Sequence, residues 1–195
     1  TSGLLASGCN VVDLGILPTP ALQYAVKDLK TSGGIIVTAS HNPPEFNGLK
    51  FIAGDGTEFS REQEGQIERI YNDNDFSSAP WDRVGRRSCD RHVHDRYRDA
   101  IISGGNLDGR AIKAVVDCGN GTSWEYTPDI LKRLGCEVVT LNAQPDGCFP
   151  GRLPEPTEKN LTSLMRAVKQ HGSDQCVAHD GDADRATFVD DQGNF

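Results

Sequence analysis

Short apolar runs, each ending in a polar loop, alternate with helical patterns along this chain, and that alternation restricts the possible fold more than any other feature. Residues 35–37 form one such β-branched run, residues 112–116 a second, and residues 136–141 and 175–178 two more. Short apolar runs bounded by turn residues are typical of buried strands. Strands that alternate with helices predict an α/β architecture with largely parallel sheets.

The chain is expected to divide into two domains. Residues 72–87 are rich in Asn, Asp, Ser and Arg and show no apolar period, which is typical of a linker. A length of 195 residues allows two small domains. We therefore expect two three-layer α/β domains with mostly parallel sheets, one over residues 1–88, linker included, and one over residues 89–195. Because the chain opens at Thr1 without an initiator methionine, we also expect it to be a fragment of a longer protein.

The first domain is predicted to contain a β-α-β unit. Residues 10–14 have the pattern of a strand, and Thr19 is the predicted N-cap of the helix that follows. The strand at 35–37 comes next, so the two strands are expected to be parallel and joined by a right-handed crossover. Asn47-Gly48 is a turn signal that sends the chain back as a further strand.

A serine lies on the loop that ends the apolar run Ile-Ile-Val. Ser40 is followed by His41 and Asn42-Pro43, and the proline favours a turn there. Open α/β sheets bind ligands at the carboxyl ends of their strands, which is where Ser40 lies. A serine beside a histidine is a weak signal alone, because neighbours on an extended chain point to opposite faces, and a polar turn is the alternative. Lys50, on the returning strand, is a candidate general acid or base near Ser40.

An acidic loop follows the run at 175–178. Asp180, Asp182 and Asp184 alternate along it, and three such carboxylates suit a hard divalent cation. A solvated acidic loop is one alternative. An EF-hand loop is another, but Arg185 stands where that loop needs glycine, and the flanks resemble strands rather than helices. A hydroxyl nucleophile together with a metal indicates phosphoryl transfer.

Two other polar groups have plainer explanations. His92 and His94 are two residues apart on a predicted helix, so their side chains diverge, and we interpret them as helix surface rather than metal ligands. The Gly-x-Gly spacing at residues 117–121 is weak evidence for a nucleotide loop, and we interpret it as an ordinary strand-to-helix turn.

Composition excludes several classes of partner and compartment. The net charge of −8 argues against nucleic acid or an anionic membrane as the main partner. No apolar run approaches the roughly 18 residues of a membrane span. The six cysteines include no Cys-x-x-Cys pair, and Cys118, Cys136 and Cys176 lie in or beside apolar strands. Buried reduced thiols of this kind indicate a cytoplasmic protein.

Two longer motifs resemble those of one enzyme family. Thr-Ala-Ser-His-Asn-Pro at 38–43, with Asn-Gly-x-Lys ending at Lys50, resembles the phosphoserine loop of the α-D-phosphohexomutases, which comprise phosphoglucomutases, phosphomannomutases and phosphoglucosamine mutases. Asp-Gly-Asp-Ala-Asp-Arg at 180–185 resembles the magnesium loop of that family. Further segments that resemble the family's, in the family's order, lie at 17–20, 117–121 and 154–157.

The resemblance implies that the protein interconverts a hexose 1-phosphate and a hexose 6-phosphate through a phosphoserine enzyme and a bisphosphorylated sugar. Ser40 would carry the phosphoryl group. Asp180, Asp182 and Asp184 would hold Mg²⁺, which would also touch the Ser40 phosphate. The substrate would be a glucose, mannose or glucosamine phosphate.

The resemblance also assigns roles to the neighbouring side chains. Lys50 would act as general acid and base, and Arg185 would contact phosphate or sugar. His41, which we group with the catalytic residues, and Asn42, which we group with the phosphate-binding residues, would shape the phosphoserine loop. The family enzyme has four domains, and this chain resembles the later part of the first and most of the second. The third and fourth domains are therefore implied partners, and the piece alone is expected not to be fully active.

Two alternatives remain open from the residues. One is an inactive fragment or a magnesium-binding module without turnover. The other is a phosphatase that uses Asp180 or Asp182 as its nucleophile and leaves Ser40 unmodified.

Overall fold

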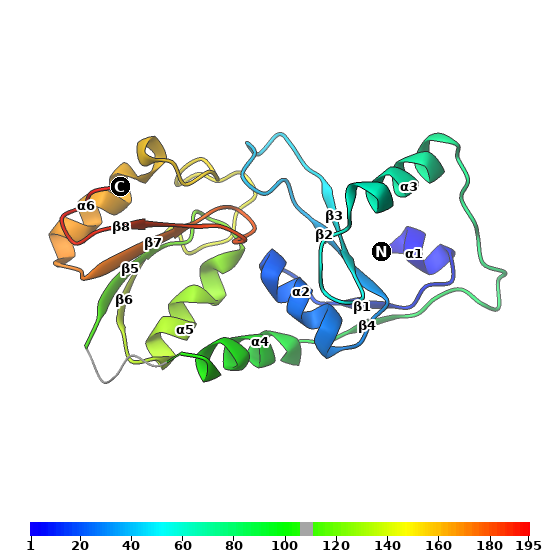
Figure 1. Ribbon diagram of the computed structural model, residues 1–195, viewed down its shortest axis with the longest axis horizontal. Coiled ribbons are helices and arrows are strands. Elements are labelled where there is room, and N and C mark those ends of the chain that lie inside the picture. Colours follow the sequence, from blue (N-terminus) through cyan, green and yellow to red (C-terminus); the bar gives the residue numbers. More distant parts are fainter. Residues whose placement is uncertain (106–110) are drawn as a thin grey trace.

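The computed structural model describes residues 1–105 and 111–195, which form two lobes side by side along the longest axis of the molecule (Figure 1). The first lobe contains α1, β1, α2, β2, β3, α3 and β4, and the second contains α4, β5, α5, β6, α6, β7 and β8 (Figure 1). Both lobes are α/β domains, as the alternating sequence pattern predicts.

The elements of the first domain are short. In chain order they are α1 (Ser2–Ala6), β1 (Val11–Asp13), α2 (Thr19–Asp28), β2 (Gly33–Val37), β3 (Leu49–Ala53), α3 (Arg61–Asn72) and β4 (Arg87–Cys89). The helix α3 begins with a capping box, because the Ser60 side chain accepts from the backbone N–H of Gln63 and the Gln63 side chain accepts from that of Ser60. Residues 73–86 contain no helix or strand and run along the side of this domain that faces away from the second one (Figure 1).

The predicted β-α-β unit, with its first two strands parallel, is not formed within one sheet. β2 pairs with β3 in antiparallel register, with Ile36 opposite Lys50, and β1 pairs instead with β4 in parallel. The β2–β3 pair is the return that the Asn47-Gly48 turn predicts, whereas β1 and β2 belong to separate two-stranded sheets. Gly34 on β2 lets α2 approach closely, because a Cβ there would lie 2.7 Å from a methyl carbon of Val26.

The second domain is built on one sheet with the strand order β6-β5-β7-β8. Its elements are α4 (His92–Ser103), β5 (Lys113–Asp117), α5 (Thr127–Arg133), β6 (Glu137–Leu141), α6 (Thr162–His171), β7 (Gln175–His179) and β8 (Ala186–Val189), with 3₁₀ turns at Thr122–Glu125 and Glu158–Leu161. β5, β6 and β7 are parallel, and β8 returns antiparallel to β7. Three of the five strand pairings in the described residues are therefore parallel.

Two apolar cores hold the molecule together. One lies within the second domain, where Leu164 and Val168 of α6 pack on the sheet around Val115. The other joins the two domains, because Leu22 and Val26 of α2 share it with residues of α4 and α5. Its buried members are Leu14, Leu17, Ala21, Leu22, Ala25, Val26, Ile52, Val93, Tyr126 and Ile130. This shared core fixes α2 against the second domain, and the position of α2 matters for the site.

The two histidines of α4 differ from each other. His92 is exposed, as predicted for a helix surface. The same prediction for His94 is wrong, because its ring lies partly buried between the domains. Its Nε2 is 2.7 Å from the Leu14 carbonyl oxygen and its Nδ1 is 2.5 Å from the Tyr126 hydroxyl. Nε2 therefore donates to the carbonyl, and Nδ1 accepts from the tyrosine, so His94 is an interdomain contact.

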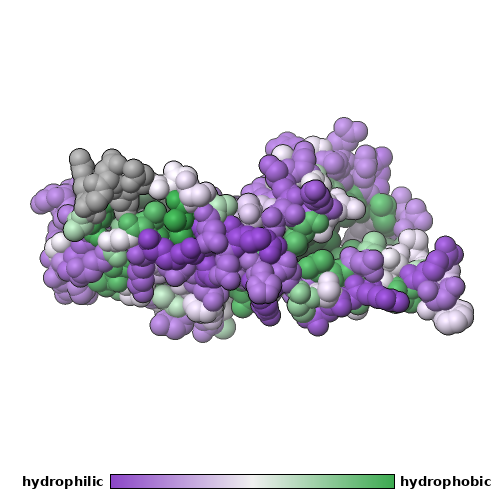
Figure 2. All heavy atoms as spheres, turned by 90° about the horizontal axis from the view of Figure 1, so that it is seen from below, coloured by the Kyte–Doolittle hydropathy of each residue, from purple (hydrophilic) through white to green (hydrophobic). Residues whose placement is uncertain are grey.

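The surface of the molecule exposes both polar and apolar side chains. Figure 2 shows hydrophilic side chains over much of one face, with apolar groups visible in both lobes. On the β2–β3 pair, Val37 is 66% and Leu49 is 58% exposed. Cys118, Cys136 and Cys176 are buried, as predicted, whereas Cys9, Cys89 and Cys148 are exposed. Within the described ranges no helix combines the length and apolarity needed to cross a membrane.

Candidate active site

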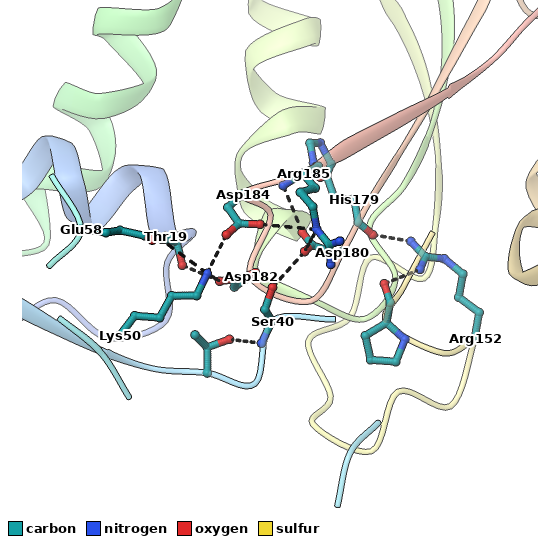
Figure 3. Close-up of polar contacts among 12 residues, drawn as sticks. Thr19, Ser40, Lys50, Glu58, Arg152, His179, Asp180, Asp182, Asp184 and Arg185 are labelled. Atoms are coloured by element: carbon teal, nitrogen blue, oxygen red, sulfur yellow. Dashed lines mark hydrogen bonds and ion pairs between the residues drawn. The ribbon is translucent and has the colours of Figure 1, made fainter. Parts of the chain in front are cut away.

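Ser40 and the acidic loop, 140 residues apart in the chain, meet where the two domains face each other (Figure 3). The Ser40 hydroxyl lies 3.2 Å from Asp180 Oδ2 and donates to it. Ser40 follows β2 and adopts a left-handed backbone with φ +54°, and the Thr38 hydroxyl accepts from its N–H at 2.8 Å. The end of the strand therefore turns sharply at Ser40 and presents its side chain to the second domain.

The acidic loop joins β7 to β8, so its flanks are strands and an EF-hand is excluded. Asp180, Asp182 and Asp184 each offer a carboxylate oxygen, and these oxygens lie within 4.8 Å of one another. Asp180 and Asp182 are 0% and 1% exposed. Burial, followed by the charge of Asp182, raises the pKa of Asp180 above its ordinary value. The loop thus gathers negative charge in a place where water screens it poorly.

The donors of this cluster fit a hard divalent cation. Oδ1 of Asp182 is buried and has no hydrogen-bond partner among the described residues. An orphaned buried carboxylate oxygen costs free energy unless a cation or donor satisfies it. Carboxylate oxygens are the ligands that Mg²⁺ and Ca²⁺ prefer. Asp180, Asp182 and Asp184 are therefore the residues that could hold such an ion.

Lys50 reaches the same cluster from the first domain (Figure 3). Its Nζ lies 3.0 Å from Asp182 Oδ2 and 2.6 Å from Asp184 Oδ2. Burial alone would lower the pKa of Lys50, but the hydrogen bonds to Asp184 and Asp182, together with the negative charges of these two residues, outweigh it and raise the pKa. The antiparallel return of β3 brings Lys50 back to the Ser40 end of β2, as the turn signal predicts. The raised pKa keeps the Lys50 side chain positively charged there.

Arg185 turns back onto the loop that precedes it. Its Nε lies 3.0 Å from Asp180 Oδ2, and its backbone N–H donates to Asp180 Oδ1 at 3.2 Å. The Arg185 side chain is 44% exposed, so it stays accessible to solvent next to Asp180, the residue that accepts from the Ser40 hydroxyl. A positive group of this kind, next to the serine, can contact an anionic ligand.

His41 and Asn42 take no part in the hydrogen bonds of the acidic cluster within the described residues. Nδ1 of His41 is buried and has no partner there. The backbone N–H of Asn42 donates to the carbonyl of Ala39 at 3.0 Å, which closes the turn that carries Ser40. Their predicted influence on the loop stays a prediction.

Thr19 lies at the site, although sequence reasoning assigned it no role beyond helix capping and a place in the family-like segment 17–20. Pro18 is the N-cap of α2, and Thr19 is its first residue, so the N-cap prediction is wrong. Thr19 is 1% exposed, and its hydroxyl donates to Asp182 Oδ2 at 2.7 Å. The signal in the sequence, a threonine between two prolines, specifies the start of a helix but not what that helix faces.

Arg152 is a second residue that sequence reasoning missed. Its side chain is 4% exposed, and its Nε pairs with Asp117 Oδ2 at 2.8 Å. Its Nη2 donates to the carbonyl oxygen of His179 at 2.5 Å (Figure 3). His179 is the residue immediately before Asp180. The turn at residues 117–121 thus braces the acidic loop, and the backbone N–H of Thr122 adds a bond of 3.0 Å to the Gly181 carbonyl.

Comparison with known proteins agrees with this architecture. Residues 1–78 match the family model described as phosphoglucomutase/phosphomannomutase, alpha/beta/alpha domain I, and residues 95–193 match the model for alpha/beta/alpha domain II. A structure of a phosphoglucomutase/phosphomannomutase family protein from Burkholderia thailandensis superposes with a TM-score of 0.86 at 35% identity, over 98% of this chain and 42% of that one.

Curated relatives are longer than this chain. A probable phosphoglucosamine mutase from Methanopyrus kandleri is 47% identical over 194 residues, and a phosphoglucomutase/phosphomannomutase from Thermococcus kodakarensis is 45% identical over 199 residues. Each alignment covers 100% of this chain and 43% of the relative. The motif resemblance is thereby confirmed: the chain belongs to the phosphoglucomutase/phosphomannomutase family, within the α-D-phosphohexomutases.

Proposed function

We propose that this chain carries the phosphoserine and metal-binding parts of a phosphohexomutase, which interconverts a hexose 1-phosphate and a hexose 6-phosphate through a phosphoserine enzyme and a bisphosphorylated sugar. One observation carries the proposal: the Ser40 hydroxyl donates at 3.2 Å to a buried aspartate of a three-carboxylate cluster on the other domain. A nucleophilic hydroxyl beside a cation site supports phosphoryl transfer.

Asp180, Asp182 and Asp184 would hold the cation, and we propose Mg²⁺ because the donors are all carboxylate oxygens. When bound, the ion neutralises negative charge on a phosphoryl group at Ser40. Ser40 itself would complete the ligand set through its phosphate. The left-handed backbone at Ser40, with φ +54°, holds its side chain toward the acidic loop.

We propose that phosphoryl transfer exchanges one phosphorus–oxygen bond for another. The bond from phosphorus to the Ser40 oxygen breaks while a bond from phosphorus to a sugar hydroxyl oxygen forms. Lys50, held as an ammonium group by Asp182 and Asp184, donates a proton to the departing Ser40 oxygen, while the attacking sugar hydroxyl releases its own proton to solvent water. In the return step the Ser40 hydroxyl attacks the other phosphate and gives its proton back to Lys50, and the departing sugar oxygen takes up a proton from solvent water. Arg185 would bind phosphate or sugar, with His41 and Asn42 shaping the loop.

The substrate class follows from the relatives' names, which include phosphoglucosamine mutase and phosphoglucomutase/phosphomannomutase. We propose a glucose, mannose or glucosamine phosphate as substrate. Because the chain spans 43% of the length of these relatives, we also propose that the family's third and fourth domains complete the sugar site in the whole, cytoplasmic protein.

The decisive experiment is phosphorylation of the chain by glucose 1,6-bisphosphate in the presence of Mg²⁺. Intact mass and fragment mass spectrometry should find one phosphoryl group, on Ser40, in the wild type. Ser40→Ala should gain none, and Ser78→Ala, which changes an exposed serine of the 73–86 segment, should behave as the wild type.

The same spectra separate the alternatives. A phosphoryl group on Asp180 or Asp182 would indicate an aspartate-nucleophile phosphatase instead. That reading is disfavoured because Asp180 is 0% exposed and both its oxygens already accept hydrogen bonds from Ser40 or Arg185. A binding module is favoured if the chain binds Mg²⁺ but takes up no phosphate, either alone or joined to the family's third and fourth domains.

A further inference from the structure

Thr19 holds Asp182 at two points from the other domain. Its hydroxyl donates to Asp182 Oδ2 at 2.7 Å, and its backbone N–H donates to the Asp182 carbonyl oxygen at 2.9 Å. Both residues are buried, since Thr19 and Asp182 are each 1% exposed. The two bonds tie the side chain and the main chain of one loop residue to the first turn of α2.

The two carboxylate oxygens of Asp182 are consequently different. Oδ2 accepts from the Thr19 hydroxyl and from Lys50 Nζ, the latter at 3.0 Å. Oδ1 is buried and accepts from no group among the described residues. Two donors on one oxygen fix the rotation of the carboxylate, and the other oxygen is left as the free acceptor within the cluster.

The two donors on Oδ2 are not equivalent. Lys50 is 26% exposed, sits on a flexible four-carbon stem and also contacts Asp184 and Glu58. The Thr19 side chain is short and β-branched, and it lies at the start of a helix whose N-cap is Pro18 and whose second residue is Pro20. Thr19 is therefore the fixed donor of the pair. Its hydroxyl is neutral, so unlike the Lys50 ammonium group it does not repel a cation bound by the cluster.

We propose that Thr19 is a positioning residue that orients Asp182 for cation binding and so couples the cation affinity of the acidic loop to the docking of the two domains. The inference rests on the proposed function of Asp180, Asp182 and Asp184 as a cation site. Without the hydroxyl, Oδ2 keeps only the lysine as a donor. The carboxylate can then rotate, and Oδ1 loses its fixed place in the cluster. Groups that orient a metal ligand typically change affinity by about tenfold to a hundredfold when removed.

The test compares Mg²⁺ affinity, by calorimetry, with the melting temperature of the metal-free chain in wild type, Thr19→Val and Thr19→Ser. Thr19→Val replaces the hydroxyl with a methyl group of similar size and should weaken Mg²⁺ binding by about tenfold or more. Thr19→Ser keeps the hydroxyl and should stay within about threefold of the wild type. Thr57→Val is the matched control, because the Thr57 hydroxyl also donates to an aspartate, Asp55, at 2.7 Å, but on an exposed turn.

The outcomes are separable. A folded Thr19→Val chain with wild-type Mg²⁺ affinity overturns the inference, even if its melting temperature falls, since that is the result of a purely structural contact. If Thr19→Val does not fold, Thr19→Cys takes its place, because a thiol is close in size to a hydroxyl but is a weak hydrogen-bond donor. Equal Mg²⁺ affinity in Thr19→Cys and Thr19→Ser would then overturn the inference. A wild type that binds no Mg²⁺ overturns the cation site itself.

Discussion

Arg152 places a full positive charge in the interior, and four acceptors compensate it. They are Asp117 Oδ2 and the carbonyl oxygens of Leu153, Pro154 and His179. A buried ion pair adds little net stability over apolar residues, but removal of one partner leaves the other charged and buried. Arg152 is therefore best understood as a brace for the carbonyl that precedes Asp180.

Replacement of Arg152 tests this account at the scale of one residue. Arg152→Met should lower the free energy of unfolding by about 3–5 kcal/mol, because Asp117 is left buried without its cation. Urea denaturation of the metal-free chain measures the change. Arg87→Met is the control, since Arg87 pairs with Asp13 at 2.6 Å on the surface, and it should change stability little. Similar losses in the two variants would contradict the account.

Ser40 allows a second test at this scale. A left-handed backbone at φ +54° costs an L-residue about 1–2 kcal/mol and costs glycine nothing comparable. Ser40→Gly should therefore be more stable than Ser40→Ala by about 1 kcal/mol in chemical denaturation. Lys30 has φ +51° on a surface turn, so the Gly and Ala variants at Lys30 should show the same difference. A difference at Lys30 but none at Ser40 would show that the serine loop relaxes in solution.

Gly181 lies where the acidic loop packs closely against the serine loop. A Cβ at Gly181 would lie 2.6 Å from the Ser40 carbonyl oxygen, and one at Gly121 would lie 2.5 Å from the Gly181 carbonyl oxygen. Both distances are shorter than real Cβ contacts. The absence of side chains at these two glycines lets the serine loop, the acidic loop and the strand-to-helix turn approach one another.

Gly181→Ala should therefore separate the two loops. We expect the free energy of unfolding to fall by about 1–3 kcal/mol, as for overpacking, with a loss of phosphoryl uptake at Ser40. Gly65→Ala is the opposite case: Gly65 lies inside α3 with open space around it, so alanine should raise stability by about 0.5–1 kcal/mol. A Gly181→Ala chain that keeps wild-type stability and phosphorylation would exclude a tight loop contact.

The elements also show what the sequence can predict. The capping box of α3, the return from β2 to β3 and the acidic loop between two strands were all predictable, because each depends on neighbouring residues. The partner of β1 was not, since β4 lies beyond two helices and two strands and nothing local selects it. Thr19 and Arg152 were missed for the same reason: the Thr19 hydroxyl meets Asp182 across 163 residues.

At the scale of the whole molecule, attraction and repulsion act at the same interface. The shared core of α2, α4 and α5 draws the two domains together by burying apolar surface. Beside it, Ser40 of one domain faces the acidic cluster of the other. A phosphate on Ser40 brings about 1.5–2 negative charges to that point. Two unit charges at ~4 Å repel by about 4 kcal/mol at an effective dielectric constant of 20.

Mg²⁺ should therefore stabilise the phosphorylated chain more than the unmodified one. Without the ion, phosphorylation should lower the melting temperature, because the phosphate repels Asp180 and its neighbours. With the ion, the same phosphate becomes a ligand shared between the domains, and the Mg²⁺-induced rise in melting temperature should be largest in the phosphoprotein. Thermal melts with Mg²⁺ and with chelator, on confirmed phosphoprotein and on Ser40→Ala, measure the two shifts. Equal shifts would mean that the ion bound by the acidic loop does not touch the serine phosphate, and the shared site would have to be abandoned.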